Sequence, residues 1–221
     1  SEKLAHNNWF DLGCSYLHNG SVNPFTSIAR KIKFPIDINN GDIFDSNRTH
    51  YFSNREKINL GFPNPLDRAH HKLLTKIENS HTDTALLEAM NSDDPYFSIA
   101  CHLSANLNAA DPDVVSSKDY RASIYKGTDY PVPKGFGNLV KKWGQNVKVC
   151  LNTKVLKINS EGSLVKLITS KGNLLTQKVI LTVSTGILSG RDIEIIPPLP
   201  KETLSAISNL PMGTLNKIGI S

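Results

Sequence analysis

The chain has 221 residues, of which 39% are hydrophobic and 20% are charged, and lysine plus arginine outnumber aspartate plus glutamate by 25 to 20. This composition is typical of a folded globular protein and excludes an intrinsically disordered one. The basic residues are scattered and no apolar run approaches the ~20 residues of a membrane-spanning helix, so we expect neither a nucleic-acid partner nor a membrane. Three widely spaced cysteines give no disulfide framework, which favours a cytoplasmic location.

Residues 9–35 predict a strand, a tight loop and a helix. An apolar run at residues 9–12 favours the strand, and Asn23-Pro24 favours a helix start, because asparagine caps helices and proline suits the first helical position. Pro35 then ends the helix. Its apolar stripe at helical spacing consists of Phe25, Ile28, Ala29 and Ile32.

Residues 36–129 are polar and irregular, yet helical spacing of apolar residues predicts two helices, at 66–77 and 96–107, and a shorter one within 83–90. His70-His71 and His81 invite a metal site. Their spacing matches no zinc pattern, however, and histidines on a polar helix face are more often solvated. We therefore expect no metal.

Residues 130–221 have the most regular pattern. Apolar spacing predicts helices at 136–143 and 204–210. Period-two runs between turn residues predict strands at 147–151, 155–158, 164–169, 174–183 and 215–220. The continuous run Val179-Ile180-Leu181 indicates burial on both faces of its strand. The predicted fold class is α+β, with a mainly antiparallel or mixed sheet and packed helices.

The residues alone name no reaction. The sequence contains no Gly-x-Gly-x-x-Gly after a strand, no phosphate-binding P-loop and no Gly-x-Ser-x-Gly elbow. Lys141-Lys142 beside Trp143 is more typical of a solvated helix face than of a nucleic-acid contact.

A series of short segments nevertheless resembles the flavin-containing amine oxidases, which include monoamine oxidases, polyamine oxidases and flavin-dependent histone lysine demethylases. The first is Asp-Leu-Gly-Cys-Ser-Tyr-Leu-His at residues 11–18, followed by Asn23-Pro24. The others follow in the family's order: Pro-Lys-Gly-Phe-Gly-Asn-Leu at 133–139, Leu-Asn-Thr-Lys-Val at 151–155, Val-Ile-Leu-Thr-Val-Ser-Thr-Gly-Ile-Leu at 179–188, Pro-Pro-Leu-Pro at 197–200 and Gly-Thr-Leu-Asn-Lys-Ile at 213–218. Each segment is weak evidence alone, but their shared order is specific.

The resemblance implies an FAD-dependent enzyme that oxidises an amine. In this family a hydride passes from the carbon next to the amine nitrogen to flavin N5, water hydrolyses the imine, and dioxygen reoxidises the flavin to give hydrogen peroxide. Lys217 matches the lysine that binds a water near N5. His18 matches a histidine that polyamine-type members place near the substrate amine, which favours a polyamine. The structural alternatives are a solvated lysine and a loop histidine bonded to backbone.

The resemblance also implies which residues contact the flavin. The backbone at Gly13 would pass close to it, since glycine allows close approach, and Val155 would lie under the adenine end, although an apolar strand residue would be core in any fold. The residues expected to bind the flavin are Gly13, Cys14, Ser15, Tyr16, Val155 and Thr182.

By the same resemblance, residues 1–36 and 131–190 belong to the flavin domain, and residues 37–130 and 191–221 belong to the substrate domain. The family's glycine-rich phosphate turn and its C-terminal flavin segment have no match in this sequence, and Ser184 stands where proline is usual. We therefore expect an internal segment that is inactive alone and that has the missing N- and C-terminal parts of the same enzyme as partners, besides a small-molecule amine. The alternative is a non-catalytic truncated relative that acts as a binding or scaffold module.

Overall fold

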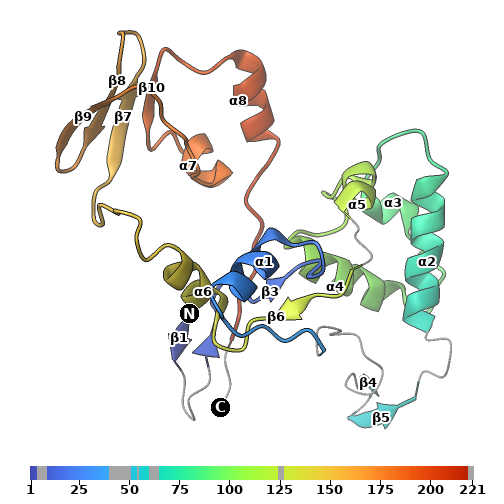
Figure 1. Cartoon of the computed structure of the whole chain (residues 1–221). Helices are drawn as coiled ribbons and strands as arrows, with labels where there is room; N and C mark the ends of the chain where they lie inside the picture. Colours follow the sequence, from blue (N-terminus) through green and yellow to red (C-terminus); the bar gives the residue numbers. More distant parts are fainter. Residues whose placement is uncertain (4–8, 40–50, 54, 60–64, 124–126, 219–221) are drawn as a thin grey trace. The chain divides into compact units, whose positions relative to one another are not determined.

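The computed structural model describes residues 1–3, 9–39, 51–53, 55–59, 65–123 and 127–218. The chain packs as two compact units, Ser1–Asn146 with Thr214–Ser221 (unit 1) and Val147–Gly213 (unit 2). Helices and short strands occur in both (Figure 1), which confirms the α+β class. The division into flavin and substrate domains stays a prediction, because compact packing and ligand contact are different properties.

One half of unit 1 is built from the first and third stretches of the sequence. Its elements are β3 (Tyr16–Leu17), α1 (Pro24–Lys31), β6 (Tyr130–Pro131) and α6 (Phe136–Trp143). Both helices confirm the predictions. α1 begins as expected, because Asn23 Oδ1 accepts a hydrogen bond from the Phe25 amide at 3.0 Å. These elements bury one apolar cluster, formed by Leu17, Ala29, Val132 and Leu139.

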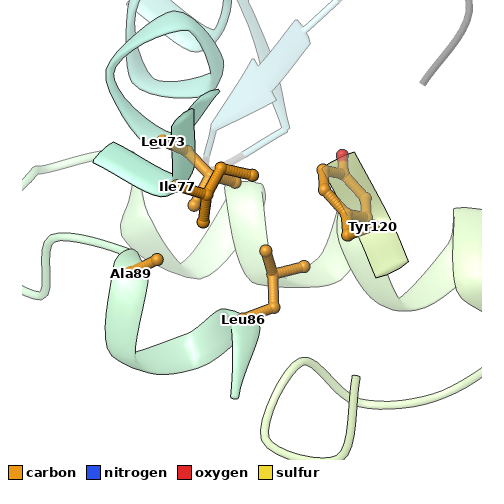
Figure 2. Close-up of a cluster of buried hydrophobic side chains, with 5 residues drawn as sticks. All are labelled: Leu73, Ile77, Leu86, Ala89 and Tyr120. Atoms are coloured by element: carbon orange, nitrogen blue, oxygen red, sulfur yellow. The ribbon is translucent and has the colours of Figure 1, made fainter. Parts of the chain in front are cut away.

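The other half of unit 1 is helical. It contains α2 (Pro65–Glu78), α3 (Leu86–Ala89), α4 (Phe97–Asn108) and α5 (Ser117–Ser123). Figure 2 shows the second apolar cluster, in which Leu73, Ile77, Leu86, Ala89 and Tyr120 meet. The sequence predicts α2, α3 and α4. It does not reveal α5, because this helix buries Tyr120 as its only large apolar side chain and so shows no stripe.

Short strand pairs complete unit 1. β1 (Glu2–Lys3) pairs with β2 (Trp9–Phe10), and β4 (Tyr51–Ser53) pairs with β5 (Glu56–Ile58), both antiparallel. β3 and β6 also pair antiparallel, with Leu17 opposite Tyr130. This third pairing joins two segments that are far apart in the sequence.

Unit 2 contains a four-stranded mixed sheet in the order β10-β7-β8-β9 (Figure 1). The strands are β7 (Val155–Asn159), β8 (Val165–Thr169), β9 (Gly172–Thr176) and β10 (Glu194–Ile196). β10 runs parallel to β7, with Glu194 opposite Lys157, and their side chains form an ion pair at 3.0 Å. Two helices accompany the sheet, α7 (Thr185–Ser189) and α8 (Lys201–Ser208).

Three strand predictions are wrong in whole or in part. Residues 147–151 form turns and irregular backbone, and β9 ends at Thr176, so the run at 179–181 lies outside the sheet, with Ile180 89% exposed. Residues 215–218 form no strand either, and residues 219–221 lie outside the described residues. In each case the apolar pattern is present, but within the described chain no neighbouring strand pairs with it, and a strand requires a hydrogen-bonded neighbour.

A short helix that the sequence analysis does not predict, α7, begins just after the expected strand at residues 174–183. Ser184 is the N-cap residue, and its hydroxyl accepts a hydrogen bond from the Ile187 amide at 3.4 Å. Serine favours this position, so the residue that replaces the family's usual proline has a local structural role. Among the described residues, no helix combines the length and the apolarity needed to cross a bilayer.

Candidate functional site

The segment with the first family motif, residues 11–18, follows β2 directly and includes β3 in unit 1. Leu17 is 1% exposed and anchors this segment in the first apolar cluster. Side chains alternate along a strand, and Tyr16 and His18 on either side of Leu17 are half-buried and exposed, respectively. Leu17 therefore anchors the segment in the core, whereas Tyr16 and His18 lie nearer the protein surface.

Asp11 ties the start of this segment to α6. Its carboxylate accepts hydrogen bonds from the backbone amides of Phe136, at 2.7 Å, and Gly137, at 3.4 Å. Gly135, the N-cap of α6, has φ of +86°, a conformation that suits glycine, and it has no side chain with which to cap the helix. Asp11 supplies the acceptor from a distant segment.

The pKa of Asp11 is set by two opposing effects. Burial of the carboxyl group raises the pKa, but hydrogen bonds from Ser1 and from the amides of Phe136 and Gly137 outweigh burial and lower the pKa below 3.8. The ionised form is therefore the one that α6 stabilises.

Lys217 lies against the same segment. Its ammonium group donates hydrogen bonds to the backbone carbonyl of Gly13 and to the hydroxyl of Ser15, the latter at 2.6 Å. Ser15 and Lys217 belong to the first and last family segments, so the structure brings together two regions that the resemblance had linked only by their motifs.

His18 occupies the end of the segment, with its ring near Tyr16 at 6.5 Å between centroids. Its Nδ1 lies 2.9 Å from Asp129 Oδ2, and its backbone carbonyl accepts a hydrogen bond from Asn23 Nδ2 at 2.9 Å. The expected alternative, an imidazole bonded to backbone, differs from this contact, because the partner of Nδ1 is a carboxylate.

The structure thus gathers part of the predicted site. The predicted residues that lie along or against one segment of unit 1 are Gly13, Cys14, Ser15, Tyr16, His18 and Lys217. Val155, the first residue of β7, and Thr182, in the exposed chain before α7, lie in unit 2 and their expected flavin contacts stay predictions.

Sequence reasoning missed Asp129 and the second role of Asn23. Asp129 lies immediately before β6, which pairs with β3, so its position next to His18 follows from strand pairing that no local pattern reveals. Asn23 has a helix-cap signal, but its amide donor to His18 has no signature in the sequence.

The local chemistry fits the ring end of a flavin. A Cβ on Gly13 would meet open space beyond its chain neighbours in the described structure, so the backbone is accessible to a flat ring. The ammonium of Lys217 and the hydroxyl of Ser15 are polar groups at the Gly13 carbonyl. The sequence has no glycine-rich turn for a pyrophosphate.

The histidines that suggested a metal lie elsewhere. His70 Nε2 is 3.1 Å from the hydroxyl of Tyr120, beside the second apolar cluster. In the part of the chain that the structure describes, no three histidine, cysteine, aspartate or glutamate side chains group as ligands for a metal ion.

Comparisons with known proteins agree with the motifs. The family model "Flavin containing amine oxidoreductase" matches residues 84–221, more than half of the chain. "Polyamine oxidase 4" of Oryza sativa subsp. japonica is 30% identical over 114 residues, which cover 51% of this chain and 23% of that protein. "Lysine-specific histone demethylase 1 homolog 3" of Oryza sativa subsp. indica is 30% identical over 90 residues, which cover 40% of this chain and 11% of that protein.

Among solved structures, cyclohexylamine oxidase from Brevibacterium oxydans IH-35A matches with a TM-score of 0.63 and 15% identity over 90% of this chain and 52% of that one. This likeness supports the fold. The chain spans about half of that structure and under a quarter of the two curated relatives. Because the family model covers most of the chain and its motifs occur in order, the chain belongs to the flavin-containing amine oxidoreductase family.

Proposed function

We propose that this chain is a segment of an FAD-dependent amine oxidase, in which Lys217 and His18 act at the flavin and at the substrate amine. The observation that carries the proposal is the contact of Lys217 with Gly13 and Ser15, in the same segment that presents His18. The first and the last family motif of the chain thereby contribute to one polar site.

The proposed roles follow from the chemistry of each group. A bound flavin supplies the hydride acceptor for oxidation of the amine. The Lys217 ammonium holds a water beside the ring through its third N–H, because the other two donate to Gly13 and Ser15. The imidazole of His18, which is 66% exposed, accepts a proton from the substrate's ammonium, so that the amine reacts in its neutral form.

We propose a polyamine as the substrate class. Two observations support this choice: His18 lies in the segment that Lys217 contacts, and two relatives carry polyamine oxidase in their names. Two other relatives are named as histone lysine demethylases, so a peptide with methylated lysine is the competing substrate. Both are secondary or tertiary amines, and the same oxidation applies to each.

The proposal also covers how tightly the chain binds FAD and where in the cell the protein is located. The sequence offers no phosphate turn, so we propose that these 221 residues hold FAD weakly and do not turn over alone, and that further parts of the enzyme supply the pyrophosphate contacts. Cys14, Cys101 and Cys150 are all free thiols, which supports a reducing, cytoplasmic setting.

The test starts with an absorbance spectrum of the purified chain, before and after incubation with FAD and gel filtration. We expect little retained flavin for the chain alone and a stable flavin band once N- and C-terminal amine-oxidase segments are supplied in trans or by fusion. The reconstituted protein should release hydrogen peroxide with spermine or spermidine, and less with a methylated lysine peptide or benzylamine. A reconstituted protein that folds but neither binds flavin nor oxidises any of these amines would favour the binding-module alternative.

A further inference from the structure

The carboxylate of Asp129 contacts one ring nitrogen of His18 and a neighbouring backbone amide. Asp129 Oδ2 lies 2.9 Å from His18 Nδ1, and Asp129 Oδ1 accepts a hydrogen bond from the Asn19 amide at 3.1 Å. The side chain of Asp129 is 16% exposed, whereas that of His18 is 66% exposed. The carboxylate is therefore the sheltered member of the pair, and the imidazole extends from it into solvent.

The backbone next to both members of this pair also forms hydrogen bonds. β3 and β6 pair directly beside it, with Leu17 opposite Tyr130. The Gly20 amide donates to the carbonyl of Thr128 at 2.8 Å, and Asn23 Nδ2 donates to the carbonyl of His18 at 2.9 Å. Residues on either side of His18 and Asp129 thus have backbone hydrogen-bond partners, so the contact lies within a hydrogen-bonded frame.

We infer that Asp129 is a positioning residue that holds His18 in the tautomer with its proton on Nδ1. An ionised carboxylate can only accept hydrogen bonds, so Nδ1 must be the donor of this contact. In neutral imidazole one nitrogen donates and the other accepts, so Nε2 is left as the acceptor. Neither the family comparison nor the sequence motifs assign a role to Asp129.

The chemical consequence rests on the proposed function. The substrate's ammonium N–H bond breaks, its proton moves to His18 Nε2, and the amine keeps the electron pair that its oxidation requires. The resulting imidazolium keeps its Nδ1–H hydrogen bond to the Asp129 carboxylate. Because the ring is exposed, the proton then passes to water and the neutral tautomer returns.

The first test does not depend on the flavin. Nitrogen-15 NMR of the labelled chain distinguishes a protonated ring nitrogen from an unprotonated one, and the variant His18→Gln identifies the His18 signals by their loss. We expect a protonated Nδ1 and an unprotonated Nε2 at neutral pH in the wild-type chain. A wild-type His18 with its proton on Nε2 would overturn the inference, whether or not any variant folds.

Two variants and a control sharpen this result. Asp129→Ala should shift His18 toward the Nε2–H tautomer, while the exposed Asp93→Ala in the same unit leaves the signals unchanged. Asp129→Asn keeps the size of the side chain, but its single carbonyl oxygen cannot serve both His18 and the Asn19 amide, so the preference should weaken without loss of fold. An unchanged tautomer in a folded Asp129→Ala chain counts against the inference.

The second test uses the flavin-loaded, reconstituted enzyme. We expect Asp129→Ala to lower kcat/KM for the amine by about tenfold to a hundredfold, less than the ~10²- to 10⁴-fold contribution of the acid–base group itself. In a His18→Ala background the same substitution should have almost no further effect, because Asp129 acts through His18. A further loss of the same size in that background would indicate a merely structural role. If the wild-type enzyme oxidises no amine, the proposed function fails while the tautomer result still decides the role of Asp129.

Discussion

The ammonium group of Lys217 donates a hydrogen bond to the hydroxyl of Ser15 at 2.6 Å, although 202 positions of sequence separate the two residues. The same ammonium contacts the carbonyl of Gly13. The last family segment of the chain therefore lies on the first one, and the two supply a charged donor and a backbone that is open to a flat ring.

Removal of the Lys217 charge tests whether this contact is functional. We expect Lys217→Met in the flavin-loaded, reconstituted enzyme to lower the rate of amine oxidation by roughly 10²-fold, because the polar group that holds a water at the ring is lost. Stopped-flow absorbance at the flavin band separates reduction by the amine from reoxidation by dioxygen. Lys178, an exposed lysine of unit 2, provides the matched control Lys178→Met, which should leave both steps unchanged.

Ser15→Ala should have a smaller effect than Lys217→Met. The Gly13 carbonyl still accepts from the ammonium after the hydroxyl is removed, so the lysine keeps one of its two anchors. We expect a loss of a few fold in the rate, consistent with about 0.5–1.5 kcal/mol for one hydrogen bond. A loss as large as that of Lys217→Met would instead mean that Ser15 contacts the reacting groups itself.

Asp11→Ala should destabilise the chain in a pH-dependent way. Loss of the carboxylate leaves the first amides of α6 without their acceptor, at a cost of about 1 kcal/mol by analogy with helix caps. Such a loss lowers Tm by roughly 2–4 °C in a chain of this size. Thermal denaturation followed by circular dichroism measures it, and the exposed Asp113→Ala is the control.

The sign of the pH effect follows from the lowered pKa of Asp11. A carboxyl whose pKa is lower in the folded state contributes its stability above its unfolded pKa, near 3.8, and loses that contribution as the pH falls through the folded value. The Tm difference between wild type and Asp11→Ala should thus be constant near neutrality and shrink below about pH 4. A difference that grows on acidification would contradict this assignment.

Asn23 has two separable roles. Asn23→Ala should lower stability by about 1 kcal/mol, because α1 loses its cap. Asn23→Asp keeps the capping oxygen but removes the amide donor to the His18 carbonyl. We expect this variant to lose less stability than Asn23→Ala, because the cap remains, while the amide and ring signals of His18 shift in the NMR spectrum. Unchanged His18 signals would show that the second bond has no role in holding the loop.

Leu139→Ala tests the packing under the candidate site. Leu139 is 0% exposed in the cluster that also contains Leu17, which anchors the first family segment. A cavity at this position should destabilise the chain by roughly 2–5 kcal/mol. Leu107 is 60% exposed on α4, so Leu107→Ala should change stability by less than about 0.5 kcal/mol. Urea denaturation compares the two, and similar midpoints for both variants would show that the cluster is not a core.

The local signals in the sequence predicted most of the helices, but not α5 or α7. Asn23-Pro24 marks the start of α1, and apolar stripes mark α2, α4, α6 and α8, because capping and helical spacing depend on residues a few positions apart. The strands were harder to predict. The run at residues 179–181 has the composition of a buried strand, yet Ile180 is exposed, because strand formation requires a partner that local composition cannot supply.

The candidate site shows the same difference between local sequence signals and long-range contacts. The motifs at residues 11–18 and 213–218 identify the family and nominate His18 and Lys217 without any coordinates. The contact of Lys217 with Ser15, the pairing of β3 with β6 and the carboxylate of Asp129 beside His18 join residues more than 100 positions apart. Their proximity depends on how the helices and strands pack, so only the tertiary structure decided which groups hold the two candidate residues in place.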